Sequence, residues 1–222
     1  LLTAGARVRT WKFDLDAYFR KTGKNRADWW KSGFVLQDGF GHDRRVQFGQ
    51  REAPVLTGRQ SCFLAFQMKR ELRRLDAAYP SRAASVVAWL AWRLGLSREA
   101  GAGGDASWAV LFFLLMFVDD VGAASIDDDL FDADGRPMLL LDGATLVRHT
   151  RARLHYEAAI GVISYFGHSD SPGKGFLPGP ESMDFLGVGV CFARRMLVLS
   201  RDKRDTYGAM ALAVVGGLAG LE

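Results

Sequence analysis

The pattern of apolar and polar positions predicts several strands. Residues 10–19 mix β-branched, aromatic and apolar side chains, as expected for a strand that enters a turn. Residues 34–48 predict two strands joined at Asp38-Gly39, a dipeptide typical of hairpins. The apolar run of residues 108–118 is continuous, which predicts a strand buried on both faces. Further hairpins are expected at residues 127–143, and at residues 182–190 with 195–199.

Helical spacing of apolar residues predicts the helices between these strands. Residues 57–75 place apolar positions between Lys, Arg and Glu, which is typical of an amphipathic helix. A second helix is expected from a cap at Ser81 or Ser85 to Gly95. Residues 144–166 predict a longer helix, and the C-terminus is also expected to be helical. The longer helix would have a basic face with Arg148, Arg151 and Arg153. This order of elements predicts an α+β fold with an antiparallel sheet covered by helices on one face.

Charge is distributed unevenly along the 222 residues. The net charge is +4, but residues 105–142 carry nine acidic residues and one basic residue. Residues 1–80 carry 16 Lys/Arg and eight Asp/Glu. Basic flanks suit a polyanion and an acidic centre suits divalent cations. A solvated surface with uneven charge is the alternative interpretation.

Other composition features exclude several classes of protein. Cys62 and Cys191 have neither metal-ligand spacing nor a disulfide framework, and their apolar surroundings favour core packing. The N-terminal residues lack the pattern of a signal peptide. The longest apolar stretches, residues 108–118 and 209–221, are shorter than the ~20 residues that span a bilayer. We therefore expect no membrane association and an intracellular location, cytoplasmic or nuclear.

Two adjacent carboxylates end the apolar run, in Phe117-Val118-Asp119-Asp120. Desolvated carboxylates repel one another, so this arrangement is costly unless the groups are paired or bind metal. A third acidic group, Asp14, lies far upstream in a predicted strand. Oxygen ligands of this kind can hold two divalent ions over a phosphate. An acidic calcium-binding loop at residues 127–134 is the other candidate, although its spacing does not fit an EF-hand.

Further short motifs follow the same order along the chain. They are Asp14–Phe19, Phe48–Pro54 with Arg59, Phe117–Asp120, Phe166–Lys174, Met183–Val188, and Leu197–Ser200 with Lys203. Together they resemble the palm of reverse transcriptases (RNA-directed DNA polymerases) of retroelements, of the LTR or DIRS-like type. Each motif alone is weak, whereas their shared order across residues 11–207 is specific.

The resemblance implies catalytic and metal-binding roles. Asp14 and Asp119 are the implied ligands of two Mg²⁺ ions, with Mn²⁺ as an alternative metal. The carbonyl of Leu15 would supply a further oxygen, and Asp120 would be an occasional ligand. Lys174 would act as general acid for the pyrophosphate leaving group, while a solvated loop lysine is the alternative.

The resemblance also implies contacts to substrates. Ala17, Tyr18, Phe19 and Gly49 would bind the incoming deoxynucleoside triphosphate. Phe19 occupies the position of the aromatic residue under the sugar; Tyr18 competes for that role, and both could be core aromatics. An RNA or DNA template with its primer would contact Arg51, Pro54, Arg59 and the turn Phe185-Leu186-Gly187. Arg59 could also be an ordinary surface residue.

The resemblance assigns residues 1–192 to a palm with insertions at about 81–105 and 127–143, and residues 193–222 to the start of a thumb. Only 13 residues precede Asp14, so the fingers are expected to be largely absent. We therefore expect a palm from a retrotransposon polyprotein that transfers nucleotides to a primer 3′ end, with little activity on its own. A catalytically inactive remnant, or a domesticated nucleic-acid-binding module, is the alternative.

Overall fold

The computed structural model describes residues 6–18, 23, 26–27, 33–36, 39–42, 45, 53–99, 111–179, 182–186, 188–192, 194, 196–199 and 201–219. The elements in chain order are β1 (Val8–Asp14), β2 (Gly33–Leu36), β3 (Gly39–His42), α2 (Ala53–Ala78), α3 (Ala84–Glu99), β4 (Phe112–Phe117), β5 (Asp120–Ile126), β6 (Leu139–Asp142), β7 (Thr145–Arg148), α4 (Arg151–Tyr165), β8 (Ser182–Phe185), β9 (Val188–Cys191), β10 (Met196–Leu199) and α5 (Arg201–Ala219). Helices and antiparallel strands alternate irregularly, so the fold is α+β as predicted.

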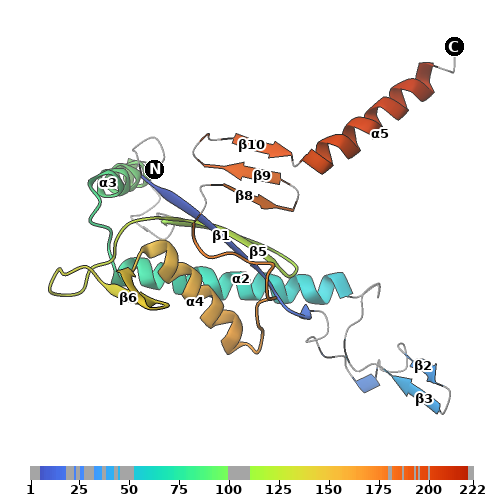
Figure 1. Cartoon of the computed structure of the whole chain (residues 1–222), viewed down its shortest axis with the longest axis horizontal. Helices are drawn as coiled ribbons and strands as arrows, with labels where there is room; N and C mark the ends of the chain where they lie inside the picture. The colour runs from blue at the N-terminus through green and yellow to red at the C-terminus, as the bar shows by residue number, and fades with distance from the viewer. Residues whose placement is uncertain are drawn as a thin grey trace.

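A three-stranded antiparallel sheet with the order β1-β5-β4 organises the fold (Figure 1). β1 pairs with β5 over its whole length, and the last pair is Asp14 with Asp120. β4 pairs with the other edge of β5, and its last pair is Phe117 with Asp120. Because directly paired residues point to the same face of a sheet, Asp14 and Asp120 share one face.

The opposite face of this sheet carries the main core. Figure 1 shows α2 and α4 on one side of β1 and β5, and the small sheet of β8, β9 and β10 on the other. Apolar residues of the strands and of the two helices form one buried cluster, which includes Trp11, Phe13, Leu114, Val121, Leu64, Met68, Leu72, Ala159 and Ile163. The prediction of an antiparallel sheet with helices on one face is therefore confirmed.

The prediction that residues 108–118 form a strand buried on both faces is wrong. β4 is an outer strand of the sheet, and its side chains alternate between the helices and the surface. Phe113, Leu115 and Phe117 are 50%, 44% and 59% exposed. The fully buried strand is β5, where residues 121–126 are all buried, because β5 lies between two other strands and is covered on both faces.

The prediction of one helix over residues 144–166 is also wrong. Residues 139–148 form the hairpin of β6 and β7, which turns at Gly143 with a φ of 63°. The predicted hairpin at 127–143 is therefore shifted toward the C-terminus. Helix α4 begins only at Arg151, where the Thr150 side chain caps it by accepting a hydrogen bond from the Arg153 amide. The signal for this turn was Asp142-Gly143, a hairpin dipeptide of the same kind as Asp38-Gly39.

The sequence pattern predicted that Arg151 lies on a basic helix surface, and this prediction is wrong because Arg151 lies in the interior. Its side chain is 1% exposed and donates two hydrogen bonds to Asp128, one to Asp76 and one to the Tyr79 carbonyl. Asp76 in turn contacts His155, whose other ring nitrogen lies 3.0 Å from the Ser125 hydroxyl. This network joins α2, α4 and β5, so charge pairing adds to apolar packing in the fold.

The remaining predictions of secondary structure are largely confirmed. β2 and β3 form the predicted hairpin, and α2 and α3 contain the two predicted helices. The predicted C-terminal hairpin has a third strand, because β9 pairs with both β8 and β10. Among the described residues, no helix has both the length and the apolar content needed to cross a bilayer.

Candidate functional site

Two of the three predicted carboxylates lie directly opposite each other in the central sheet. Asp14 is the last residue of β1 and pairs with Asp120, the first residue of β5. Asp119 precedes Asp120 in the two-residue turn that joins β4 to β5. Its carbonyl accepts a hydrogen bond of 2.9 Å from the amide of Leu15, which follows Asp14. The fold thus brings together acidic residues that are more than 100 positions apart in the sequence.

The turn between β4 and β5 has a strained backbone. Val118, its first residue, has a φ of 56°, in the left-handed region that β-branched residues rarely adopt. A residue held in this region costs on the order of 1–3 kcal/mol and persists only where surrounding contacts enforce it. The strain is located beside the acidic pair, which is typical of turns that position functional groups.

The loop after α4 brings a positive charge to the same place. Residues 169–179 run alongside β1 and exchange backbone hydrogen bonds with it, among them Ser171 N to Asp14 O and Phe176 N to Lys12 O. Gly175 lies so close to β1 that a Cβ there would be 2.7 Å from the carbonyl oxygen of Lys12. Lys174 precedes it, and its Nζ donates to Asp14 Oδ2 at 2.6 Å.

The charges of this cluster influence one another. Burial raises the pKa of Asp119, and the nearby charge of Asp14 raises it further. Burial also raises the pKa of Asp120, to which the charges of Asp14 and Asp119 contribute. The hydrogen bond to Asp14, together with the attraction of all three carboxylates, raises the pKa of Lys174. Negative charge is therefore in excess at this site, which is the condition under which a bound cation is stabilised.

The carboxylates have the chemistry of a site for hard divalent cations, because Mg²⁺ prefers carboxylate oxygens. Within the described residues, however, no group of three or more His, Cys, Asp or Glu side chains is already arranged around a common point for a metal. Lys174 takes up one carboxylate oxygen of Asp14. The residues Asp14, Asp119 and Asp120 fit a metal ligand set in type and adjacency, and a metal bound at Asp14 Oδ2 would displace the Lys174 ammonium.

The residues expected to contact a nucleotide are only partly described. Ala17 is exposed and has a φ of 48°, whereas Phe19 and Gly49 lie outside the described residues. Tyr18 is 1% exposed, and its hydroxyl lies 3.1 Å from the Thr57 carbonyl and 3.0 Å from the Ser61 hydroxyl of α2. This burial raises the pKa of Tyr18 to about 12. Of the two alternatives for Tyr18, the geometry favours the core aromatic.

The residues expected to contact template and primer are spread over two elements. Pro54 lies in the first turn of α2, where proline is well tolerated, and Arg59 is an exposed residue of the same helix. Phe185 packs over Gly122 of β5, and Leu186, with a φ of 55°, turns the chain toward β9 and is 48% exposed. Arg51 and Gly187 lie outside the described residues.

Sequence reasoning missed two residues that shape this site. Ser61 of α2 donates to the carbonyl of Val118 at 2.7 Å. Gly122 leaves the space that the Phe185 ring fills, since a Cβ there would lie 2.5 Å from Phe185 Cδ2. Glycine two positions after Asp120 was a visible signal for close approach. Nothing in the sequence near Ser61 indicated its partner, which is 57 residues away.

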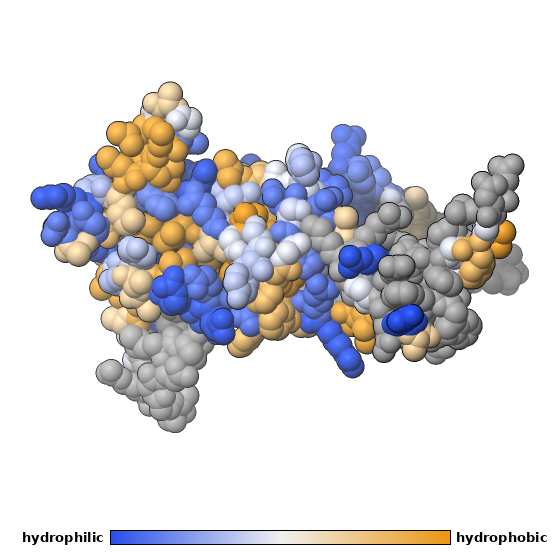
Figure 2. Space-filling model, turned by 90° about the horizontal axis from the view of Figure 1, so that it is seen from below, coloured by the Kyte–Doolittle hydropathy of each residue, from blue (hydrophilic) through white to orange (hydrophobic). Residues whose placement is uncertain are grey.

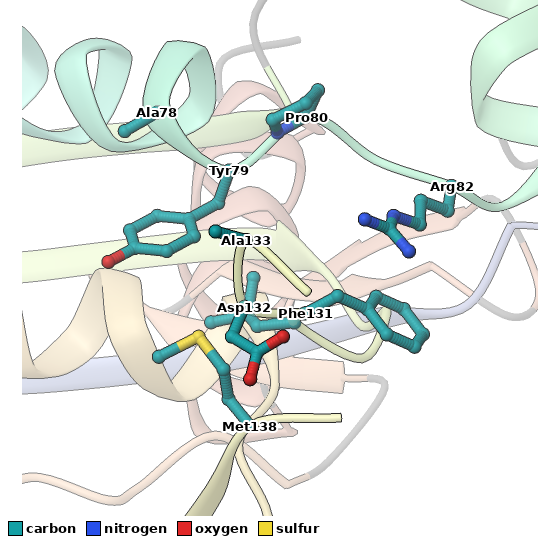
Figure 3. A pocket seen from close by; sticks show the side chains of 9 residues that line it. Ala78, Tyr79, Pro80, Arg82, Phe131, Asp132, Ala133 and Met138 are labelled. Atoms are coloured by element: carbon teal, nitrogen blue, oxygen red, sulfur yellow. The ribbon is translucent and has the colours of Figure 1, made fainter. Parts of the chain in front are cut away.

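A cavity of about 520 Å³ lies between the end of α2 and the segment before β6. Tyr79, Phe131 and Met138 line it together with Arg82 and Asp132 (Figure 3). Ser61 contacts the turn that carries Asp119, and Tyr79 lines the cavity. These two residues are 18 positions apart, or ~27 Å at 1.5 Å per helical residue, so the cavity is separate from the carboxylates.

Seen from the helix side, the surface alternates between hydrophilic and hydrophobic areas (Figure 2).

Comparison with known proteins gives a likeness in fold alone. No family model matches the sequence, and no curated protein matches it. Among solved structures, the chain is similar to a foamy viral protease-reverse transcriptase in complex with an RNA/DNA hybrid, with a TM-score of 0.47 and 12% identity over 89% of this chain. It is also similar to a foamy viral protease-reverse transcriptase in complex with dsDNA, with a TM-score of 0.49 and 13% identity over 89% of this chain. The chain spans 18% and 28% of the lengths of those two proteins.

Proposed function

We propose that this chain is the palm of an RNA-directed DNA polymerase from a retrotransposon polyprotein. The observation that carries the proposal is the pairing of Asp14 with Asp120 at the end of two antiparallel strands, with Asp119 in the adjoining turn. The acidic residues of the Phe-Val-Asp-Asp motif and of the upstream motif thus meet on one face of a sheet whose other face is covered by helices. A purely structural role would not explain why three carboxylates accumulate beside a strained turn.

The proposed chemistry is nucleotidyl transfer to a primer 3′ hydroxyl. Asp14 and Asp119 would hold Mg²⁺, with Asp120 and the Leu15 carbonyl as further oxygen donors. Two such ions, about 4 Å apart, would stabilise the attacking and the leaving oxygen. The carboxylates therefore have to stay ionised while they lie close together, although burial raises the pKa values of Asp119 and Asp120.

Lys174 would supply the proton for the leaving pyrophosphate. In the structure its Nζ is bonded to Asp14, and this contact raises the pKa of Lys174 and opposes proton release. The side chain is 68% exposed and lies in a loop with a glycine on either side, at Gly173 and Gly175. We therefore propose that Lys174 leaves Asp14 when substrate binds and then faces the phosphates.

Template, primer and deoxynucleoside triphosphate would approach the face of the β1-β5-β4 sheet that carries Asp14 and Asp120. The turn at Phe185-Leu186 lies on this face and would support the primer backbone, and Arg59 would contact a template phosphate. Binding through phosphates would weaken steeply with salt. Phe113, Leu115 and Phe117 of β4 also point to this face, which provides apolar surface beside the acidic pair.

Metal binding by the isolated chain tests the proposal without requiring activity. Free Mn²⁺ gives an electron paramagnetic resonance signal, by which its binding to the protein can be measured. The wild type should bind Mn²⁺, and Asp119→Asn should weaken the affinity by at least about tenfold because a ligand is lost. Asp134→Asn is the matched control, because Asp134 is 73% exposed in a loop outside the carboxylate cluster. Equal affinities in the wild type and Asp119→Asn would refute the metal assignment.

Activity should be measured on the chain joined to a fingers segment, since the palm alone is expected to be nearly inactive. A misplacement of substrate by ~1 Å can cost ~100-fold in rate, and fingers position the triphosphate. In primer extension with Mg²⁺ and an RNA template, Asp119→Asn should abolish synthesis and leave duplex binding nearly unchanged. A fused protein that binds Mn²⁺ and duplex but extends no primer would favour the inactive remnant instead.

A further inference from the structure

Both carbonyl groups of the turn between β4 and β5 are held by other elements. The Asp119 carbonyl accepts from the Leu15 amide of the chain just after β1, at 2.9 Å. The Val118 carbonyl accepts from the Ser61 hydroxyl of α2, at 2.7 Å. In a two-residue hairpin these carbonyls lie outside the ladder between the strands, so the turn depends on such external partners.

The Ser61 hydroxyl has one proton and three acceptors within reach. They are the Val118 and Thr57 carbonyls, each at 2.7 Å, and the Tyr18 hydroxyl at 3.0 Å. Thr57 is one helical turn before Ser61, so its carbonyl is positioned for the ordinary backbone bond of α2. The Tyr18 hydroxyl lies 3.1 Å from that same carbonyl and can donate to it. The arrangement that gives each carbonyl a hydroxyl donor has Tyr18 bonded to Thr57 and Ser61 bonded to Val118.

This contact is buried and acts on the strained residue itself. Ser61 is 4% exposed and Thr57 is fully buried, so water competes little for the hydroxyl. Val118 keeps a φ of 56° only while its surroundings hold the peptide in place. The peptide that Ser61 holds is the one directly before Asp119, so its orientation sets the direction of the Asp119 backbone and of the Asp120 carboxylate that follows.

We propose that Ser61 is a positioning residue for the acidic site: its hydroxyl fixes the turn that aligns Asp119 and Asp120 with Asp14. The metal-binding consequence of this inference rests on the proposed function. Loss of the hydroxyl frees the Val118 carbonyl, relaxes the turn and increases the spread of distances between the carboxylates. Outer partners that orient metal ligands typically change affinity by 10–100-fold when they are removed.

Hydrogen exchange of the metal-free protein tests the positioning directly. In Ser61→Ala, the Leu15 amide that bonds Asp119 should exchange about fivefold faster or more, together with the turn amides. Ser125→Ala is the matched control, because Ser125 is a 1% exposed serine of the same sheet whose hydroxyl contacts Trp11 and His155 but not the turn. Unchanged exchange at Leu15 in Ser61→Ala, or an equal increase in Ser125→Ala, would overturn the inference.

Mn²⁺ titration of the same variants tests the consequence for the site. Ser61→Ala should bind Mn²⁺ about tenfold more weakly than the wild type, Ser125→Ala should bind within twofold of it, and Ser61→Thr, which keeps the hydroxyl, should restore most of the affinity. Circular dichroism melts of all variants separate this effect from unfolding. If the wild type and Ser61→Ala bind Mn²⁺ equally well, the positioning role of Ser61 is refuted while the proposed function stands. A wild type that does not bind Mn²⁺ would overturn the proposed function, and with it the metal consequence.

Discussion

Replacing Arg151 with methionine tests whether the interior charge network stabilises this fold. Methionine fills much of the same volume but donates no hydrogen bond. The change removes two bonds to Asp128, one to Asp76 and one to the Tyr79 carbonyl. Asp76 and Asp128 are 12% and 9% exposed in their side chains, so both carboxylates lose a buried counter-charge.

The magnitude follows from the burial of the partners that remain. Removing one member of a buried ion pair typically destabilises a protein by about 3–5 kcal/mol, because an uncompensated charge is left inside. Arg151 neutralises two carboxylates, so we expect the upper part of that range. Whole domains are stable by about 5–15 kcal/mol, so this loss would be about a third or more of the total stability. Urea denaturation followed by circular dichroism measures the difference.

Arg153→Met provides a control on the same helix. Arg153 pairs with Glu157 one turn further on, and the two side chains are 27% and 42% exposed. Exposed pairs of this spacing contribute about 0.3–0.5 kcal/mol. If Arg151→Met and Arg153→Met unfold at the same urea concentration, the buried network contributes no more than a surface pair, and the reasoning is refuted.

The network also predicts a dependence on pH. Burial by itself would raise the pKa of Asp76, but the hydrogen bond and charge of His155 and the charge of Arg151 lower it overall. A lowered folded-state pKa gives stability that is present above the unfolded value of about 3.9 and is lost as pH falls through the folded value. The deficit of Arg151→Met should therefore be greatest near neutral pH and narrow in acid, where the Asp76 carboxylate can be protonated. A deficit that is constant down to low pH would contradict this account.

Two further predictions concern the acidic site. Asp120→Asn should raise the melting temperature at pH 7 but not in acid, because a carboxyl whose pKa is raised in the folded state destabilises the fold once it ionises; melts at two pH values check this. Gly122→Ala should destabilise the protein by about 1–3 kcal/mol through its clash with the Phe185 ring, and should cost much less in a Phe185→Ala background. Urea denaturation of the wild type, the two single variants and the double variant measures the coupling, and equal costs in both backgrounds would disprove the clash.

Local signals in the sequence determined much of the secondary structure and the identity of the acidic residues. Asp38-Gly39 predicted its hairpin, and the spacing of apolar residues predicted α2, because turn geometry and helix amphipathicity depend on neighbours in the chain. The adjacency of Asp119 and Asp120 was visible for the same reason. Two of the wrong predictions arose where local signals conflicted. Continuous hydrophobicity in residues 108–118 suggested full burial, and the helical pattern of residues 144–166 outweighed the turn signal of Asp142-Gly143 directly before it.

The tertiary structure decided which residues meet and which face they occupy. The register that sets Asp14 opposite Asp120 depends on packing of a whole sheet against α2 and α4, and no local pattern encodes it. The same holds for Lys174 on Asp14, for Ser61 on the Val118 carbonyl, and for Arg151, which looks like a surface residue until two distant carboxylates enclose it. Sequence patterns indicate local secondary structure and the chemistry of each side chain. Contacts between residues that are many tens of positions apart follow instead from the lowest free energy of the whole chain.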